Sequence, residues 1–98
     1  MPDYMLLMHT DAPERVDDAL WGTYLGRLQA SGHFQGGSAI GDGTCIRKVG
    51  TVPATTGHLS GYIRISAEDL THARSLVAGN PVFEAGGTVE IRELPRTG

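Results

Sequence analysis

The chain has 98 residues, 40% of them hydrophobic and 19% charged, with a formal net charge of -3. Such values are typical of one globular domain that buries roughly 60–65% of the surface of its unfolded chain. They exclude a disordered chain, and the weakly acidic balance favours neither nucleic acid nor an anionic membrane as a partner. Residues 1–98 are therefore expected to form a single domain.

The apolar run from Tyr4 to Met8 is too short to span a bilayer, and Asp3 rather than a basic segment precedes it. We therefore expect neither a membrane span nor a secretory signal. Cys45 is the single cysteine, which excludes an internal disulfide and fits a reducing cytoplasm. Cys45 itself is expected to be a small strand hydrophobe, because no local motif supports a nucleophile.

The first predicted elements are a strand and a helix. Residues 3–9 read DYMLLMH and are apolar at successive positions from Tyr4 to Met8, which is typical of a strand buried on both faces. Asp11 and Glu14 have the spacing of an N-cap and its capping-box partner. Apolar residues then recur at helical spacing, so a helix is expected from Pro13 to Ser31, ended by Gly32 in a left-handed conformation.

A hairpin and a loop are predicted next. Phe34–Ile40 and Thr44–Val49 have the composition of two short strands around the Gly-Asp-Gly of residues 41–43, which favours a hairpin turn. Residues 50–57 contain glycine, proline and threonine without a period, so a loop is expected there.

The clearest strand is HLSGYIRIS, residues 58–66. Its alternation places one set of side chains toward the core and another outward; the inward set is Leu59, Gly61, Ile63 and Ile65, and the outward set is His58, Ser60, Tyr62 and Arg64. A second helix is expected from Ala67 to Ala78, with Ser66 as its N-cap and Asp69 three residues on.

The segment GNPVFEAGG follows this helix. Because proline disfavours helical geometry at the residue before it, we expect a tight turn in which Asn80 bonds the backbone and Phe83 packs beneath the connection. The last strand, TVEIREL, is expected to point Val89, Ile91 and Leu94 inward, with Thr88, Glu90 and Arg92 outward.

The predicted order is β-α-β-β-α-β, the middle pair being lengthened into a hairpin. Right-handed crossovers then give an α+β, ferredoxin-like split βαβ fold, with an antiparallel sheet and both helices on one face. The helix-free face would expose the apolar first strand and Tyr62, a patch on the order of several hundred Å². We therefore expect a homodimer through this face, in a dimeric α/β barrel-like assembly.

Three segments resemble the YCII-related, or DGPF-domain, family of small bacterial proteins: DYMLLMH, LSGYIRISAEDLTHARSLVAGNP and GGTVEIREL. The likeness covers most of the chain and is strongest from Leu59 to Leu94. It implies a ferredoxin-like fold and dimerisation through the sheet.

The chain departs from the family pattern at two places. TVPATTGH stands where the resemblance implies Asp-Gly-Pro-Phe. The resemblance also implies a catalytic histidine in the first helix and an aspartate after the second, and Tyr24 and Asn80 occupy these positions. A tyrosine and an amide do not transfer protons as a His–Asp pair does, so catalysis stays an open question.

The candidate ligand-binding residues lie on strand faces and ends, with one added from the family position: His9, His58, Tyr62, Arg64, Glu90, Arg92 and Tyr24. Each histidine is either a hydrogen-bonded strand-end residue or an acid/base in a pocket, because imidazole titrates near neutrality. The outward strand residues form either a salt-bridged solvated face or a surface that contacts a ligand or partner. Trp21 and Phe83 are expected to be core or rim aromatics.

No metal or cofactor is expected, since the histidines lack ligand spacing and GxGxxG does not occur. Two classes of function remain. The first is a homodimer that binds a small polar or anionic ligand between the sheet and its partner subunit. The alternative is a non-catalytic interaction module that acts by dimerising or by docking on another protein.

Overall fold

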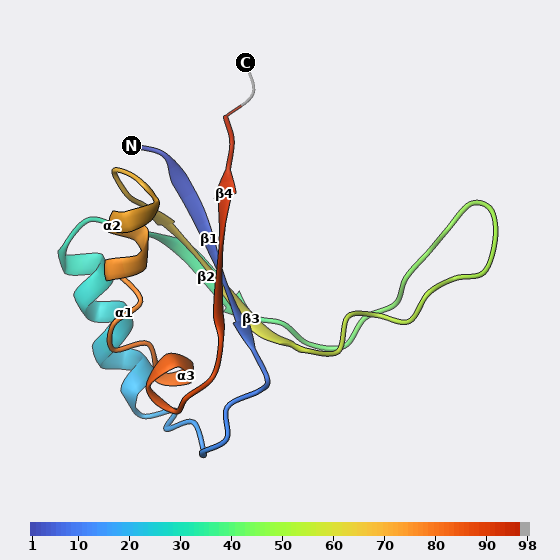
Figure 1. Ribbon diagram of the computed structural model, residues 1–98, viewed down its shortest axis with the longest axis horizontal. Coiled ribbons are helices and arrows are strands. Elements are labelled where there is room, and N and C mark those ends of the chain that lie inside the picture. The colour runs from blue at the N-terminus through green and yellow to red at the C-terminus, as the bar shows by residue number, and fades with distance from the viewer. Residues whose placement is uncertain (97–98) are drawn as a thin grey trace.

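The computed structural model describes residues 1–96 and contains a four-stranded sheet covered on one face by three helices (Figure 1). The strands are β1 (Asp3–His9), β2 (Phe34–Ala39), β3 (Leu59–Ser66) and β4 (Val89–Leu94), and the helices are α1 (Leu20–Ala30), α2 (Leu70–Ser75) and α3 (Pro81–Glu84). The sheet order is β2-β3-β1-β4, with every neighbouring pair antiparallel. This α+β arrangement is consistent with the ferredoxin-like prediction. The sequence predicts a tail over residues 95–98, and residues 97–98 of it lie outside the described residues.

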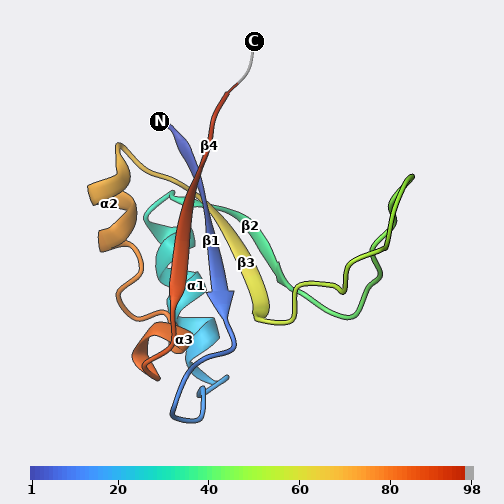
Figure 2. The same ribbon diagram turned by 45° about the vertical axis from the view of Figure 1, so that its right-hand side comes forward.

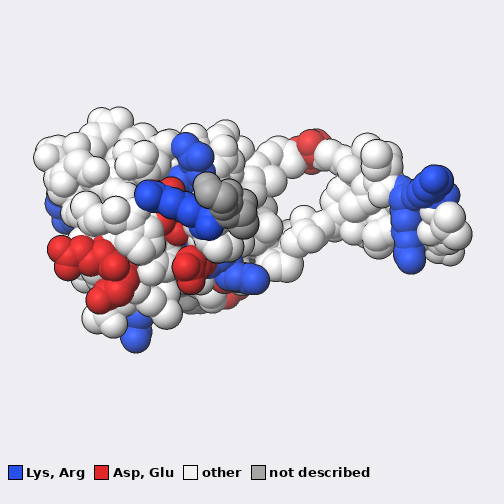
Figure 3. All heavy atoms as spheres, turned by 90° about the horizontal axis from the view of Figure 1, so that it is seen from above, with Lys and Arg blue, Asp and Glu red and all other residues white. Residues whose placement is uncertain are grey.

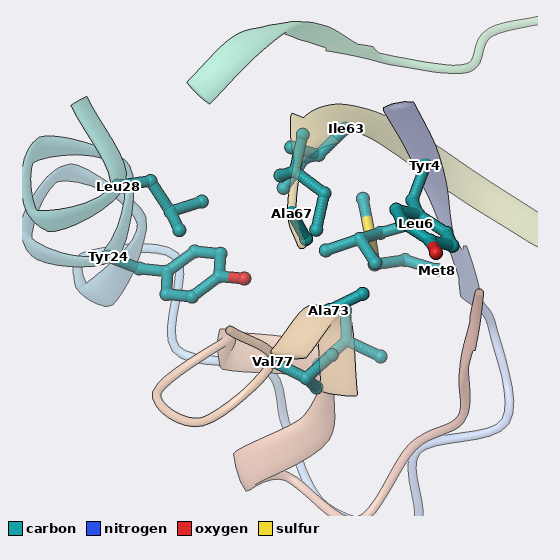
Figure 4. Close-up of a cluster of buried hydrophobic side chains, with 11 residues drawn as sticks. Tyr4, Leu6, Met8, Tyr24, Leu28, Ile63, Ala67, Ala73 and Val77 are labelled. Atoms are coloured by element: carbon teal, nitrogen blue, oxygen red, sulfur yellow. The ribbon is translucent and has the colours of Figure 1, made fainter. Parts of the chain in front are cut away.

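The sheet has one fully buried face, which packs under the helices. Leu6 of β1 lies opposite Ile63 of β3 and Ile91 of β4, whereas its neighbour Leu7 lies opposite Tyr62 and Glu90. Alternate residues of each strand therefore point to opposite faces. The buried cluster joins the helix-facing strand residues to α1 and α2 (Figure 4); among its members are Tyr4, Leu6, Met8, Tyr24, Leu28, Ile63, Ala67, Ala73 and Val77.

The opposite face has no helix. Met5 and Leu7 of β1 are half-buried there in the single chain, so the prediction of burial on both faces holds fully for one face only. Leu94 pairs with Asp3, in the same alternation as Glu90 and Arg92. The prediction that Leu94 points inward is therefore wrong: three positions after Ile91, it falls on the other side of the pleat.

Helix α1 begins seven residues later than predicted. Asp11 does not cap it, because both carboxylate oxygens accept hydrogen bonds from Thr88: Oδ1 from the backbone N–H at 2.8 Å and Oδ2 from Oγ1 at 2.6 Å. This contact attaches the β1–α1 connection to the start of β4. The predicted end is confirmed, since α1 stops at Ala30 and Gly32 has a φ of 80°.

The predicted strand over Thr44–Val49 is wrong. Residues 40–58, here called the arm, contain no strand and extend away from the sheet (Figure 2). Ile46 and Val49 are 92% and 76% exposed in this segment, so its apolar side chains lack the burial that favours a strand. The only cysteine, Cys45, lies in the arm rather than in a strand.

Helix α2 begins three residues later than predicted. Ser66 does not cap it, since it is the last residue of β3 and its N–H donates to the His33 carbonyl at 2.9 Å. Asp69 is the N-cap: its backbone is extended, and Oδ1 accepts from the His72 N–H at 2.8 Å. The helix therefore begins after Asp69, whose side chain accepts a hydrogen bond from a backbone N–H of the first turn.

The Asn-Pro turn contains a short helix, α3. The Oδ1 of Asn80 accepts from the N–H groups of Val82 at 3.0 Å and Phe83 at 3.3 Å. This confirms that Asn80 bonds the backbone, and Pro81 occupies the first helical position, where no N–H is needed. The prediction for Phe83 is wrong, because its side chain is 48% exposed; the adjacent Val82 is buried instead.

Candidate functional site

A polar cluster crosses the helix-free face at the end of β1 and includes four of the seven candidate residues. His9 contacts Glu90 of the neighbouring strand, with Nε2 at 2.9 Å from Oε1. Glu90 Oε2 accepts from Arg92 Nη1 at 3.1 Å. The His58 ring meets the His9 ring edge to face, with 5.0 Å between centroids. These four residues are called the histidine cluster below.

Strand pairing brings the cluster together. His9 closes β1, and the Thr10 N–H donates to the His58 carbonyl at 2.8 Å, which holds the base of the arm beside β1. Glu90 stands opposite Leu7, one diagonal step from His9. The two bonds to Glu90 lower the pKa of its carboxyl, the His9 contact first and Arg92 second. Glu90 is therefore a fixed anion that orients one ring nitrogen of His9.

Two further candidates lie on the same face but outside this cluster. Tyr62 is half-buried opposite Leu7. Arg64 is exposed opposite Met5, and its Nη2 donates to the Gln35 carbonyl at 2.8 Å, toward the β2 edge. Arg64 thus lies two residues farther along β3 than Tyr62 and points away from the histidines.

Tyr24 does not join the others, because it lies in α1 on the helix side of the sheet and is 1% exposed. Its hydroxyl donates to the Leu76 carbonyl at 2.7 Å. Burial raises the pKa of Tyr24, and the adjacent Asn80 amide and the Arg27 charge partly oppose the rise. Among the described residues, the buried Asn80 Nδ2 has no hydrogen-bond partner.

The two positions that the resemblance assigns to a catalytic pair are therefore close together in space. Their chemistry is different: the Tyr24 proton is held by a carbonyl, and the Asn80 oxygen is occupied by two backbone N–H groups. A phenol with a raised pKa and an amide serve poorly as an acid–base pair near neutrality. This pair ties α1 to the α2–α3 connection.

The helix side of the sheet also contains a cavity of about 430 Å³, which the sequence did not predict. It lies between α1 and the β2–β3 half of the sheet, and its lining includes Trp21, Leu25, Phe34 and Ala39. Of the seven candidates only Tyr62 borders it. The sequence signal that could have predicted it is the set of small residues at helix-facing positions, Gly37 and Ala39 of β2 and Gly61 of β3. A search for polar side chains does not consider such residues.

Within residues 1–96 no group of three or more histidine, cysteine or acidic residues is placed to hold a metal ion. None of the helices in that described part is long and apolar enough to cross a membrane.

No curated protein matches the chain. The model of the YCII-related domain matches residues 4–96 of the 98-residue chain. The match includes β1 from its second residue on, the whole of β2, β3 and β4, the buried Tyr24–Asn80 pair and the histidine cluster. The chain belongs to the YCII-related domain family.

Proposed function

We propose that residues 1–98 act as a single cytoplasmic domain that forms a homodimer through the helix-free face and binds a small anionic ligand at the histidine cluster. The contact between His9 and Glu90, with the His58 ring against His9, carries this proposal. Because His9 Nε2 donates to Glu90, a protonated His9 ring still offers Nδ1–H to a carboxylate or phosphate oxygen, and the His58 ring supplies a second N–H donor.

The charges of the helix-free face favour an anion over a cation. The whole chain has a net charge of -3, yet this face presents the guanidinium groups of Arg64 and Arg92. Glu90 forms an ion pair with Arg92, whereas Arg64 donates to the Gln35 carbonyl. The other acid here, Asp3, lies 3.6 Å from Arg96 in an ion pair. Positive groups therefore exceed negative groups on this one surface, and such a local excess attracts small anions.

The apolar residues of the same face support the dimer. Met5, Leu7, Tyr62 and Leu94 are half-buried at positions that alternate with the core. Covering them with a second copy would remove apolar surface from water, and a specific interface of this kind buries about 1,200 Å² or more in total. The partner would then complete the walls around each histidine cluster.

Light scattering and an NMR titration test the two parts of the proposal. The scattering mass should be twice the 10.4 kDa of the chain. Succinate or inorganic phosphate should shift the ring resonances of His9 and His58 saturably, with a Kd on the order of 1 mM. His9→Gln should weaken binding about three- to tenfold through the loss of one charge-assisted bond.

His72→Gln is the matched control, because His72 is also half-buried and edge to face with a second histidine, His33, at 4.8 Å. It should leave the anion titration unchanged. A mass of 10.4 kDa, or anion binding that His9→Gln and His72→Gln reduce equally, would contradict the proposal.

The alternative function, a protein-interaction module, is favoured by the arm. Ile46 and Val49 are 92% and 76% exposed there. Figure 3 shows Lys and Arg atoms in blue at the far end of the arm, whose basic residues are Arg47 and Lys48. Exposed apolar side chains flanked by charge are typical of a protein contact. The double variant Ile46→Ser, Val49→Ser should keep the dimer and the anion site but should no longer bind a partner protein through the arm.

A further inference from the structure

The cavity on the helix side is large because the strands beneath it have small residues. Gly37 of β2 pairs with Ile63, and Ala39 pairs with Gly61 of β3, in the alternation that faces the helices. A Cβ on Gly37 would come within 2.6 Å of the Tyr62 carbonyl oxygen, so β2 cannot carry a side chain there. Beside the Ile63 side chain, the floor of the cavity is therefore mainly backbone and the methyl group of Ala39.

The walls are apolar and come from several elements. Trp21 and Leu25 of α1 and Phe34 of β2 are half-buried around the space, and the buried Met8 and Val82 close its inner end. The volume of about 430 Å³ lies within the range of small-molecule sites, roughly 300–1,000 Å³. The side chains that line the cavity lack van der Waals contacts on the side of the empty space, and an apolar ligand would supply these contacts.

The mouth of the cavity is acidic. The lining residues Asp18 and Ala39 are exposed, so the space opens to solvent beside a carboxylate. No hydrogen bond or ion pair to the Asp18 carboxylate is formed within residues 1–96, and no lysine, arginine or histidine lines the cavity. A guest with a cationic end finds a free partner at this site, whereas an anion is repelled.

We propose that this cavity is a second binding site, for a small amine with an aromatic or apolar body. The ring lies between Trp21 and Phe34 over the glycine-rich floor, and the ammonium group lies at Asp18. The site is on the opposite side of the sheet from the histidine cluster and takes the opposite charge, so it does not depend on the anion-binding proposal.

The single tryptophan makes the site directly observable, because Trp21 lines the cavity and is the only indole in the chain. Phenethylamine, 2-phenylethanol and 3-phenylpropionate share a phenyl ring and differ in charge. Excited at the red edge of the indole band, the fluorescence of Trp21 should change saturably with phenethylamine, with a Kd on the order of 1 mM. The alcohol should bind about threefold more weakly, and the carboxylate more weakly still.

Two pairs of variants locate the guest. Asp18→Asn should weaken phenethylamine about threefold and leave the alcohol unchanged; Asp17→Asn, the adjacent acid outside the lining, is its control. Ala39→Leu fills the cavity and should abolish binding of both probes, while Ala54→Leu, the same change in the arm, should not. If Ala39→Leu fails to fold by circular dichroism, Val16→Phe fills the space from the other wall.

The proposal is overturned if none of the probes causes a saturable change in Trp21 fluorescence or in the indole N–H resonance. It is also overturned if the carboxylate binds as tightly as the amine, or if filling the cavity leaves binding intact. Loss of phenethylamine binding in Ala39→Leu, with retention in Ala54→Leu, supports it.

Discussion

Replacing Tyr24 with phenylalanine removes one buried hydroxyl and leaves the ring in place. The ring stays packed beside Trp21, 6.1 Å between centroids, so the change acts on polar contacts rather than on volume. The hydroxyl donates to the Leu76 carbonyl at 2.7 Å. In the variant this carbonyl, at the end of α2, and the adjacent Asn80 amide both lose a polar neighbour inside the protein.

The cost of Tyr24→Phe follows from this loss. A net hydrogen bond contributes about 1 kcal/mol, and leaving a partly buried carbonyl unpaired raises the total to about 1.5–2 kcal/mol. For a domain of this length that corresponds to a melting temperature lower by about 6–10 °C. Urea denaturation followed by circular dichroism measures the free energy, and calorimetry measures the temperature.

Tyr62→Phe is the matched control, since Tyr62 is half-buried on the helix-free face and its hydroxyl forms no hydrogen bond within the described chain. It should change stability by less than about 0.5 kcal/mol. Equal effects of the two variants would refute the reasoning, because the bond to Leu76 would then add nothing to the free energy of unfolding.

The dependence on pH gives a second test of Tyr24. Burial raises its pKa, so the folded state favours the neutral phenol. The resulting stabilisation is complete below the unfolded pKa, about 10, and is lost as the pH rises from there through the folded pKa. Tyr24→Phe should therefore reduce the fall in the free energy of unfolding above about pH 10. Tyr62→Phe, measured in the same way, should keep the contribution of Tyr24 to this fall.

Three further outcomes are expected. The contacts with His9 and Arg92 lower the pKa of Glu90, so its ionised carboxylate stabilises the folded state above the unfolded pKa, about 4.3. This stabilisation is lost as the pH falls through the folded pKa. Glu90→Gln should therefore reduce the fall of the melting temperature at acid pH, and Glu93→Gln is the control. Asn80→Ala removes both cap bonds of α3 and should cost about 2 kcal/mol in urea denaturation, with anion affinity unchanged across the sheet. Replacing residues 41–57 with a short glycine linker should change stability by less than about 1 kcal/mol, because no residue of this segment is buried.

The strands could be predicted well because their evidence is local. The alternation along β3 predicts the correct faces for Ile63 and Arg64. The order of strands and helices predicts an antiparallel sheet of the observed kind. The starts of the helices could not be obtained in the same way. Asp11 has the spacing of a cap, but its partner is Thr88, a residue near the other end of the chain. A contact so distant in sequence overrides the local preference.

The candidate site shows the same division. The histidine cluster joins residues on strands that the sequence predicts, so the sequence identifies His9, His58, Glu90 and Arg92 as candidates but not the contacts between them. The cavity was missed because it is a property of the packed elements: Ala39 becomes a floor only when α1 lies above β2. A pattern of residue types contains no information about such empty space until the layers are assembled.

The arm gives this protein a ready-made position for chemical labelling. Its two ends are fixed at the sheet, where the Ile40 N–H donates to the Ser60 carbonyl at 3.0 Å, and the only thiol of the chain, Cys45, lies between them. A maleimide dye would therefore attach at one known place without any engineered cysteine. Energy transfer from Trp21 to that dye would then measure the distance between the arm and the body of the protein, before and after a candidate ligand or protein is added.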